Sequence, residues 1–129
     1  MSLRSRLMVI ALPALLILGV AIPVSAASSG VVSGHCSRTS LTDLQVGRED
    51  NGQLSIDFGV DMARHRAGVR WLVSETDNGV LMTRTTMHTI ADGSFSLTHL
   101  MTPKRGVNHI VATARNPLTG ETCRLSTTG

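Results

Sequence analysis

Apolar and polar residues alternate along most of the chain beyond residue 40, as they do in β-strands with one buried face. The segment 53–61 shows this most clearly, because every second residue is apolar: Leu54, Ile56, Phe58 and Val60. Side chains two residues apart in a strand point to the same side, so this face should be buried. Similar segments give seven expected strands, at about 41–47, 53–61, 69–75, 80–90, 94–101, 107–115 and 121–126.

Polar segments that favour tight turns separate these strands at intervals of about 8 to 12 residues. The segments 77–79 and 91–93 are two of them, and each ends in Gly after Asn or Asp, residues that readily take the left-handed conformations of tight turns. No segment combines a helical apolar period with capping residues. We therefore expect an all-β fold, a single antiparallel β-sandwich of about seven strands, because one open sheet would leave an apolar face uncovered.

The first residues have a different composition. Arg4 and Arg6 precede an almost continuous apolar stretch over 7–22, and small residues follow at Val24 and Ala26. This order is that of a secretory signal peptide with its cleavage site. A retained membrane anchor is the alternative, but about sixteen apolar residues are fewer than the roughly twenty that a spanning helix needs.

These signals divide the chain into three parts. We expect residues 1–26 to be removed as a signal peptide, 27–35 to form a flexible leader and 36–129 to form one domain. The product would be exported, either secreted or held in the periplasm or cell envelope, with no membrane insertion after cleavage.

Two cysteines, Cys36 and Cys123, lie near the two ends of the expected domain. In an exported protein they are best interpreted as a disulfide, because the compartment is oxidising. Closing a loop of this length would stabilise the fold by roughly 4 to 5 kcal/mol in the chain-entropy model. Two free thiols, or a metal site shared with His35, are the alternatives.

Loss of the signal peptide also changes the charge balance. Of twelve Lys and Arg residues, Arg4 and Arg6 leave with the signal, so ten basic residues face nine acidic ones in the rest of the chain. A nearly neutral protein lacks the overall charge that draws proteins to nucleic acid or to acidic membranes. We therefore expect no nucleic-acid partner.

The segments 92–97, 106–114 and 119–123 resemble the last three strands of bacterial immunoglobulin-like or fibronectin-III-like modules. In this comparison Trp71 takes the place of the core tryptophan on the third strand. The resemblance implies an immunoglobulin-like β-sandwich over 36–129, and it implies no particular function, because one architecture hosts many functions.

The chain departs from that family in two respects. Immunoglobulin domains pair cysteines between their second and sixth strands, where this sequence has apolar residues such as Ile56 and Ala112. It also contains no tyrosine, so the tyrosine corner of these domains is absent.

Motifs of the common catalytic sites are missing from the sequence. It has no nucleophile elbow, no HExxH zinc motif and no phosphate-binding loop. Asp57 and Asp61 share a strand face, but four residues of strand separate them by about 13 Å, too far for a glycosidase pair. We expect no enzymatic activity and no catalytic residues, although a hydrolase site assembled from scattered Ser, His and Asp residues stays a third hypothesis.

Histidine and methionine form the most suggestive cluster. His99 and Met101 are two residues apart and so share one side of a strand, while Met87 and His88 lie on the strand before. Imidazole and thioether groups favour copper, which makes a copper site one hypothesis. The alternative is ordinary packing, because His99 and Met101 continue the face of the apolar residue Phe95; this second interpretation predicts no metal and no cofactor.

Aromatic residues are few, and Phe58, Trp71 and Phe95 all fall on expected core positions. An exposed aromatic platform for stacking on sugars is therefore not expected. Our leading hypothesis is a secreted, non-enzymatic β-sandwich that acts as a binding or structural module, with another protein as the possible partner. The second hypothesis is an exported copper-binding protein.

Overall fold

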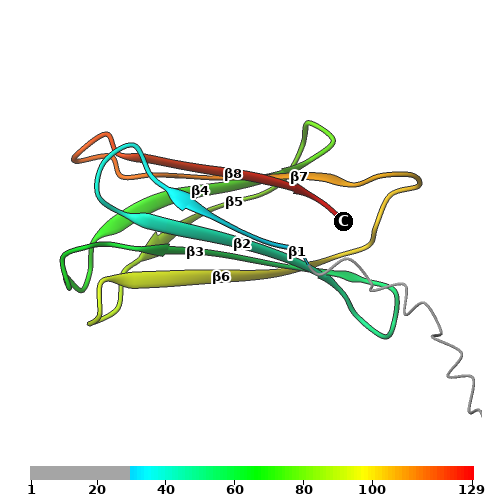
Figure 1. The fold of residues 1–129 in the computed structure, drawn as a ribbon, viewed down its shortest axis with the longest axis horizontal. Helices are drawn as coiled ribbons and strands as arrows, with labels where there is room; N and C mark the ends of the chain where they lie inside the picture. Colours follow the sequence, from blue (N-terminus) through cyan, green and yellow to red (C-terminus); the bar gives the residue numbers. More distant parts are fainter. Residues whose placement is uncertain (1–29) are drawn as a thin grey trace, which may run out of the picture.

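The computed structural model describes residues 30–129, which form eight strands in two packed antiparallel sheets (Figure 1). The strands are β1 Gly30–His35, β2 Leu41–Arg48, β3 Leu54–Asp61, β4 Arg70–Asp77, β5 Val80–His88, β6 Ser94–Met101, β7 His109–Arg115 and β8 Thr122–Thr128. One sheet has the order β1-β2-β3-β6 and the other has the order β5-β4-β7-β8. The predicted all-β sandwich is confirmed, and each of the seven expected strands is present with bounds that differ by no more than two residues.

The eighth strand corrects one expectation. Residues 27–35 are predicted to form a flexible leader, but Gly30–His35 is an ordered edge strand, β1, which pairs antiparallel with β2. Small residues let this strand pass close to β8, because a Cβ atom added at Gly34 would lie 3.1 Å from the Leu125 side chain. Small residues, which suggest a flexible segment, therefore allow close packing of β1 here. Residues 27–29 and the predicted signal peptide, 1–26, lie outside the described residues.

The apolar alternation builds the core between the two sheets. Leu54, Ile56, Phe58 and Val60 on β3 are each at most 1% exposed, so the predicted buried face is confirmed. Trp71 on β4 is fully buried, and its ring centroid lies 6.1 Å from that of Phe95 on β6 in the opposite sheet. The predicted core position of Trp71 is therefore also confirmed.

Asn78 and Gly79 form the predicted tight turn between β4 and β5. Both have a positive φ, 50° and 81°, as the central residues of a type I′ hairpin turn require. The Asn78 side chain also fixes the turn to the start of β7, because its Oδ1 accepts a hydrogen bond of 2.9 Å from the backbone N–H of His109.

Cys36 and Cys123 form the expected disulfide, with their Cα atoms 4.2 Å apart. Cys36 lies in the segment between β1 and β2, and Cys123 lies on β8 in the other sheet, so the bond joins the two layers across a sequence separation of 87 residues. Both side chains belong to the buried core. Disulfides of this kind are typical of proteins that mature in an oxidising compartment.

Candidate functional site

The second half of β4 carries two acidic side chains into the interior of the sandwich. The inward positions of this strand begin with Trp71 and Val73 and continue with Glu75 and Asp77, and both carboxylates are 0% exposed. No hydrogen-bond partner is found for any of their four carboxylate oxygens among the described residues. Buried carboxylates without donors are costly, so this end of the core differs from the apolar layers beside it.

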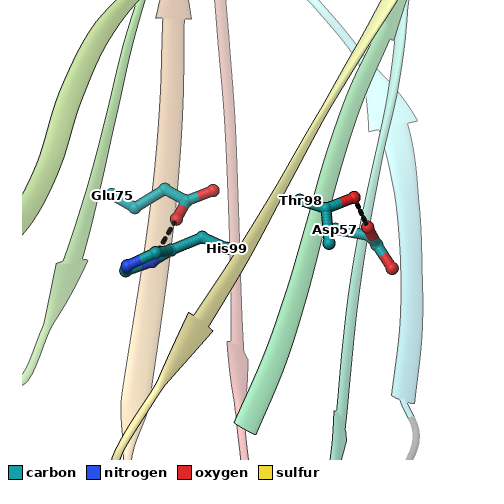
Figure 2. Close-up of polar contacts among 4 residues, drawn as sticks. All are labelled: Asp57, Glu75, Thr98 and His99. Atoms are coloured by element: carbon teal, nitrogen blue, oxygen red, sulfur yellow. Dashed lines mark hydrogen bonds and ion pairs between the residues drawn. The ribbon is translucent and has the colours of Figure 1, made fainter.

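His99 on β6 faces Glu75 from the opposite sheet (Figure 2). Its Nδ1 lies 3.3 Å from Oε2 of Glu75, at contact distance but without the geometry of a hydrogen bond. The imidazole side chain is 29% exposed, whereas the Glu75 side chain is fully buried. His99 therefore connects an internal acid to solvent.

The electrostatic environment favours the neutral form of Glu75. Burial raises the pKa of this carboxyl group to about 7, and the negative charge of Asp57 adds to the shift. Asp57 itself faces the outer side of the sheet, where its carboxylate accepts a hydrogen bond from the Thr98 hydroxyl (Figure 2). Near neutral pH the Glu75 carboxyl group can hold a proton, and it is enclosed between the two sheets.

The structure places His99 and Met101 on the same inner face of β6, as their spacing predicts. They pair with Ile56 and Leu54 of β3, and Met101 packs against the buried core. Both residues therefore occupy positions suited to ordinary packing, the alternative to copper binding. The nearest charged group found for the His99 ring is Glu75.

The other two candidate copper ligands lie apart from this pair. Met87 on β5 pairs with Trp71, four residues from Glu75, which corresponds to about 13 Å along the strand at the usual rise. His88 is exposed and belongs to the outer face. The four candidates do not converge, and within residues 30–129 no three His, Cys, Asp or Glu side chains are placed to hold a metal ion. The hypothesis of a copper site at His99 and Met101, with Met87 or His88, stays a prediction.

The outer surface of the β5-β4-β7-β8 sheet carries a feature that the sequence patterns above do not predict. Each strand contributes one exposed arginine to it: Arg70 from β4, Arg84 from β5, Arg115 from β7 and Arg124 from β8. We call this surface the arginine face. Among the described residues the one ion pair found is that of His99 with Glu75, so none of these guanidinium groups is paired with a carboxylate.

Acidic side chains are missing from the arginine face. Glu75 and Asp77, the acidic residues of β4, point inward. Glu121, which precedes β8, is 4% exposed, and its carboxylate accepts hydrogen bonds from Ser40 and from the backbone N–H of Arg38. The positive charge of this face is therefore not neutralised locally.

A shallow groove of about 430 Å³ crosses the arginine face. Its outward-facing lining consists of Leu72, Ser74, Arg84, Thr86, Thr113 and Arg115. Arg84 lies directly opposite Ser74, and Arg115 lies opposite Leu72. Two guanidinium groups beside three hydroxyl groups form a surface suited to carboxylate or other oxyanion groups, because guanidinium donates two parallel hydrogen bonds to such groups.

The opposite outer surface, on the β1-β2-β3-β6 sheet, has the reverse charge. Asp43 on β2 and Asp57 and Asp61 on β3 lie there, and no Lys or Arg of the described chain occupies an outward position on these four strands. A Cβ atom at Gly59 would lie 2.7 Å from Oδ1 of Asp43, so the glycine leaves room for this carboxylate. We call this surface the aspartate face.

The sequence contains part of the information needed to predict the arginine face. Arg70, Arg115 and Arg124 each directly adjoin a buried residue on the same strand, respectively Trp71, Ala114 and Cys123. Their outward direction follows from alternation. The order of the strands was needed to show that they share one surface, and net charge alone conceals the separation of charge.

Comparison with models of protein families, with curated proteins and with solved structures finds no match. In residues 30–129 no helix has the length and apolar character needed to span a membrane.

Proposed function

We propose that this protein is an exported, non-enzymatic module of the immunoglobulin-like type that binds an acidic partner through its arginine face. One observation carries the proposal: four exposed arginines from four adjacent strands share a surface that holds no carboxylate. Unpaired charges of one sign attract a partner of the opposite sign and orient it on approach. The hydroxyl groups of Ser74 and Thr113 between the arginines add hydrogen-bonding capacity.

Strand order supports the immunoglobulin-like assignment. If β2, β3 and β6 correspond to strands A, B and E, then β4, β7 and β8 correspond to C, F and G, which is the division between the two sheets of that fold. In this scheme β5 follows strand C in the same sheet, as C′ does in variable-type domains, and β1 is an added edge strand. Trp71 then lies buried on strand C, where immunoglobulin domains have their core tryptophan.

Export is supported by the signal-peptide pattern of residues 1–26 and by the Cys36–Cys123 disulfide. The non-enzymatic part of the proposal is supported by the enclosure of Glu75, the acid with the raised pKa, inside the sandwich. An acid or base that acts on a substrate must come within hydrogen-bond reach of it.

Retention on a polyglutamate matrix, eluted with increasing salt, tests the binding surface. We expect the exported protein to be retained and the double variant R84Q/R115Q to elute at clearly lower salt. The matched control R48Q/R105Q removes two exposed arginines that lie outside the arginine face, and it should elute as the unchanged protein does. Equal loss of retention in both double variants would show that net charge alone acts, and the proposal would be wrong.

A further inference from the structure

The two outer faces of the sandwich carry opposite charges on opposite sides of one molecule. We infer that the aspartate face of one copy docks on the arginine face of a second copy, so that the sandwiches associate head to tail. This inference rests on the proposed function, because it names a partner for the same arginine face. It also explains the aspartate face, for which an unrelated acidic partner would give no reason.

The aspartates form a compact triangle. Asp57 and Asp61 are four residues apart on β3, about 13 Å at the usual strand rise. Asp43 lies opposite Gly59 on the neighbouring strand, midway between them and about 5 Å to one side. The three carboxylates therefore define a triangle with a base of about 13 Å and a height of about 5 Å.

Three of the arginines form a triangle of similar size. Arg84 on β5 and Arg124 on β8 lie in one row across the sheet, because each pairs with a member of the Ser74–Thr113 pair. Three strand spacings separate them, about 14 Å. Arg115 on β7 lies two residues along the strands from this row, about 7 Å. The base runs across the strands here but along the strand on the aspartate face.

The two triangles overlap, with sides that differ by at most about 4 Å, when the strands of one face cross those of the other at nearly 90°. Orthogonal packing of this kind is one of the two common ways in which sheets stack. Each aspartate then meets one arginine. The contact would also cover exposed leucines, with Leu72 on the arginine face and Leu41 and Leu100 on the aspartate face, which are 40%, 49% and 53% exposed.

The size of the faces limits the strength of the contact. Four strands of about seven residues cover roughly 450 Å² at the usual spacings, less than the roughly 800 Å² per partner of a stable interface. The association should therefore be weak and sensitive to salt. Because it uses two different surfaces, it repeats from copy to copy and gives short chains rather than a closed dimer.

Sedimentation of charge-reversed variants tests this inference. We expect the mean mass of the exported protein to rise with concentration at low salt, by at least about twofold, and to return to the monomer at about 0.5 M salt, where charges are screened within a few Å. The variant D57R/D61R, with two basic faces, and the variant R84D/R115D, with two acidic faces, should each stay monomeric. Their mixture should associate.

Controls of equal net charge separate the docking surfaces from general attraction. E49R/D50R changes the β2–β3 turn, and R48D/R105D changes exposed positions outside the arginine face; both should associate as the unchanged protein does. Loss of association in these controls, or a monomeric protein at low salt, would overturn the inference. If the protein is monomeric but its retention on polyglutamate still depends on Arg84 and Arg115, the proposed function stands and the partner is another molecule.

Discussion

The imidazole Nδ1 of His99 lies 3.3 Å from Oε2 of Glu75 in the interior of the sandwich, where the two sheets meet. In the layer nearer the other end of β4, the same two strands contribute Trp71 and Phe95, whose rings pack together. The core therefore changes from aromatic to ionisable within four residues of β4. The Glu75 carboxyl group can adopt a neutral form by holding a proton, and its protonation state depends on pH.

Stability should fall as the pH rises through the range set by Glu75. Its pKa is 4.5 in the unfolded reference and about 7 in the folded protein, so between these values the folded state holds a proton that the unfolded state has released. The free energy of unfolding should then decrease by about 1.4 kcal/mol per pH unit, or about 3 kcal/mol in all. Urea unfolding between pH 4 and pH 8 measures this change.

The variant E75Q should remove most of this dependence, because its amide does not ionise. We expect it to be close to the unchanged protein at pH 4 and more stable above pH 7, by up to about 3 kcal/mol. The control D50N changes an exposed acid in the β2–β3 turn and should leave the dependence unaltered. An equally steep decrease in E75Q would assign the effect to another group.

Most of the fold was predictable because local rules agree with it. The strict alternation in β3 and the Asn78-Gly79 turn each specify their structure without distant contacts. The strand β1 was not predictable in this way. Its glycines and serine indicate flexibility, and the small size of the glycines is explained only by the closeness of β8, as the Gly34–Leu125 approach shows.

The charged sites were harder to predict from the sequence, because they depend more strongly on tertiary packing. Alternation with Trp71 already places Glu75 on the buried side of β4, but a glutamate there is normally interpreted as the end of the buried run. Its contact with His99 joins two strands that are not neighbours in either sheet, so no local pattern contains it. The arginine face likewise required the strand order.

Glu121 should be a major stabilising residue although it is acidic and buried. Its Oε2 accepts hydrogen bonds from the backbone N–H groups of Arg38 and Ser40, at 3.1 and 3.0 Å, and its Oε1 accepts one of 2.7 Å from the Ser40 hydroxyl. E121A would leave these donors unpaired, and we expect a loss of about 3 kcal/mol in the free energy of unfolding. S40A removes one bond and should lose about 1 kcal/mol. Similar losses in the two variants would contradict this account.

The Cys36–Cys123 disulfide should contribute strongly to the free energy of unfolding because it closes a long loop. With 87 residues of sequence separation, the chain-entropy model gives about 4 to 5 kcal/mol. The variant C36A/C123A and the reduced protein should both lose stability on this scale in urea unfolding. A loss below about 1 kcal/mol would show that the unfolded chain gains little freedom when the bond is absent.

Gly93 and Gly106 offer a matched test of close packing in a turn. Both have a φ of 83°, so an alanine at either position suffers the same left-handed backbone strain, about 1 kcal/mol. A Cβ atom at Gly93 would also lie 2.6 Å from the backbone oxygen of Arg64, whereas nothing lies within 4 Å of one at Gly106. The turn at Gly93 is fixed against the 62–66 segment, since the N–H of Met62 donates a hydrogen bond of 3.0 Å to the Gly93 oxygen. We therefore expect G93A to lose about 3 kcal/mol in thermal or urea unfolding and G106A about 1 kcal/mol; equal losses would mean that the 62–66 segment moves aside without cost.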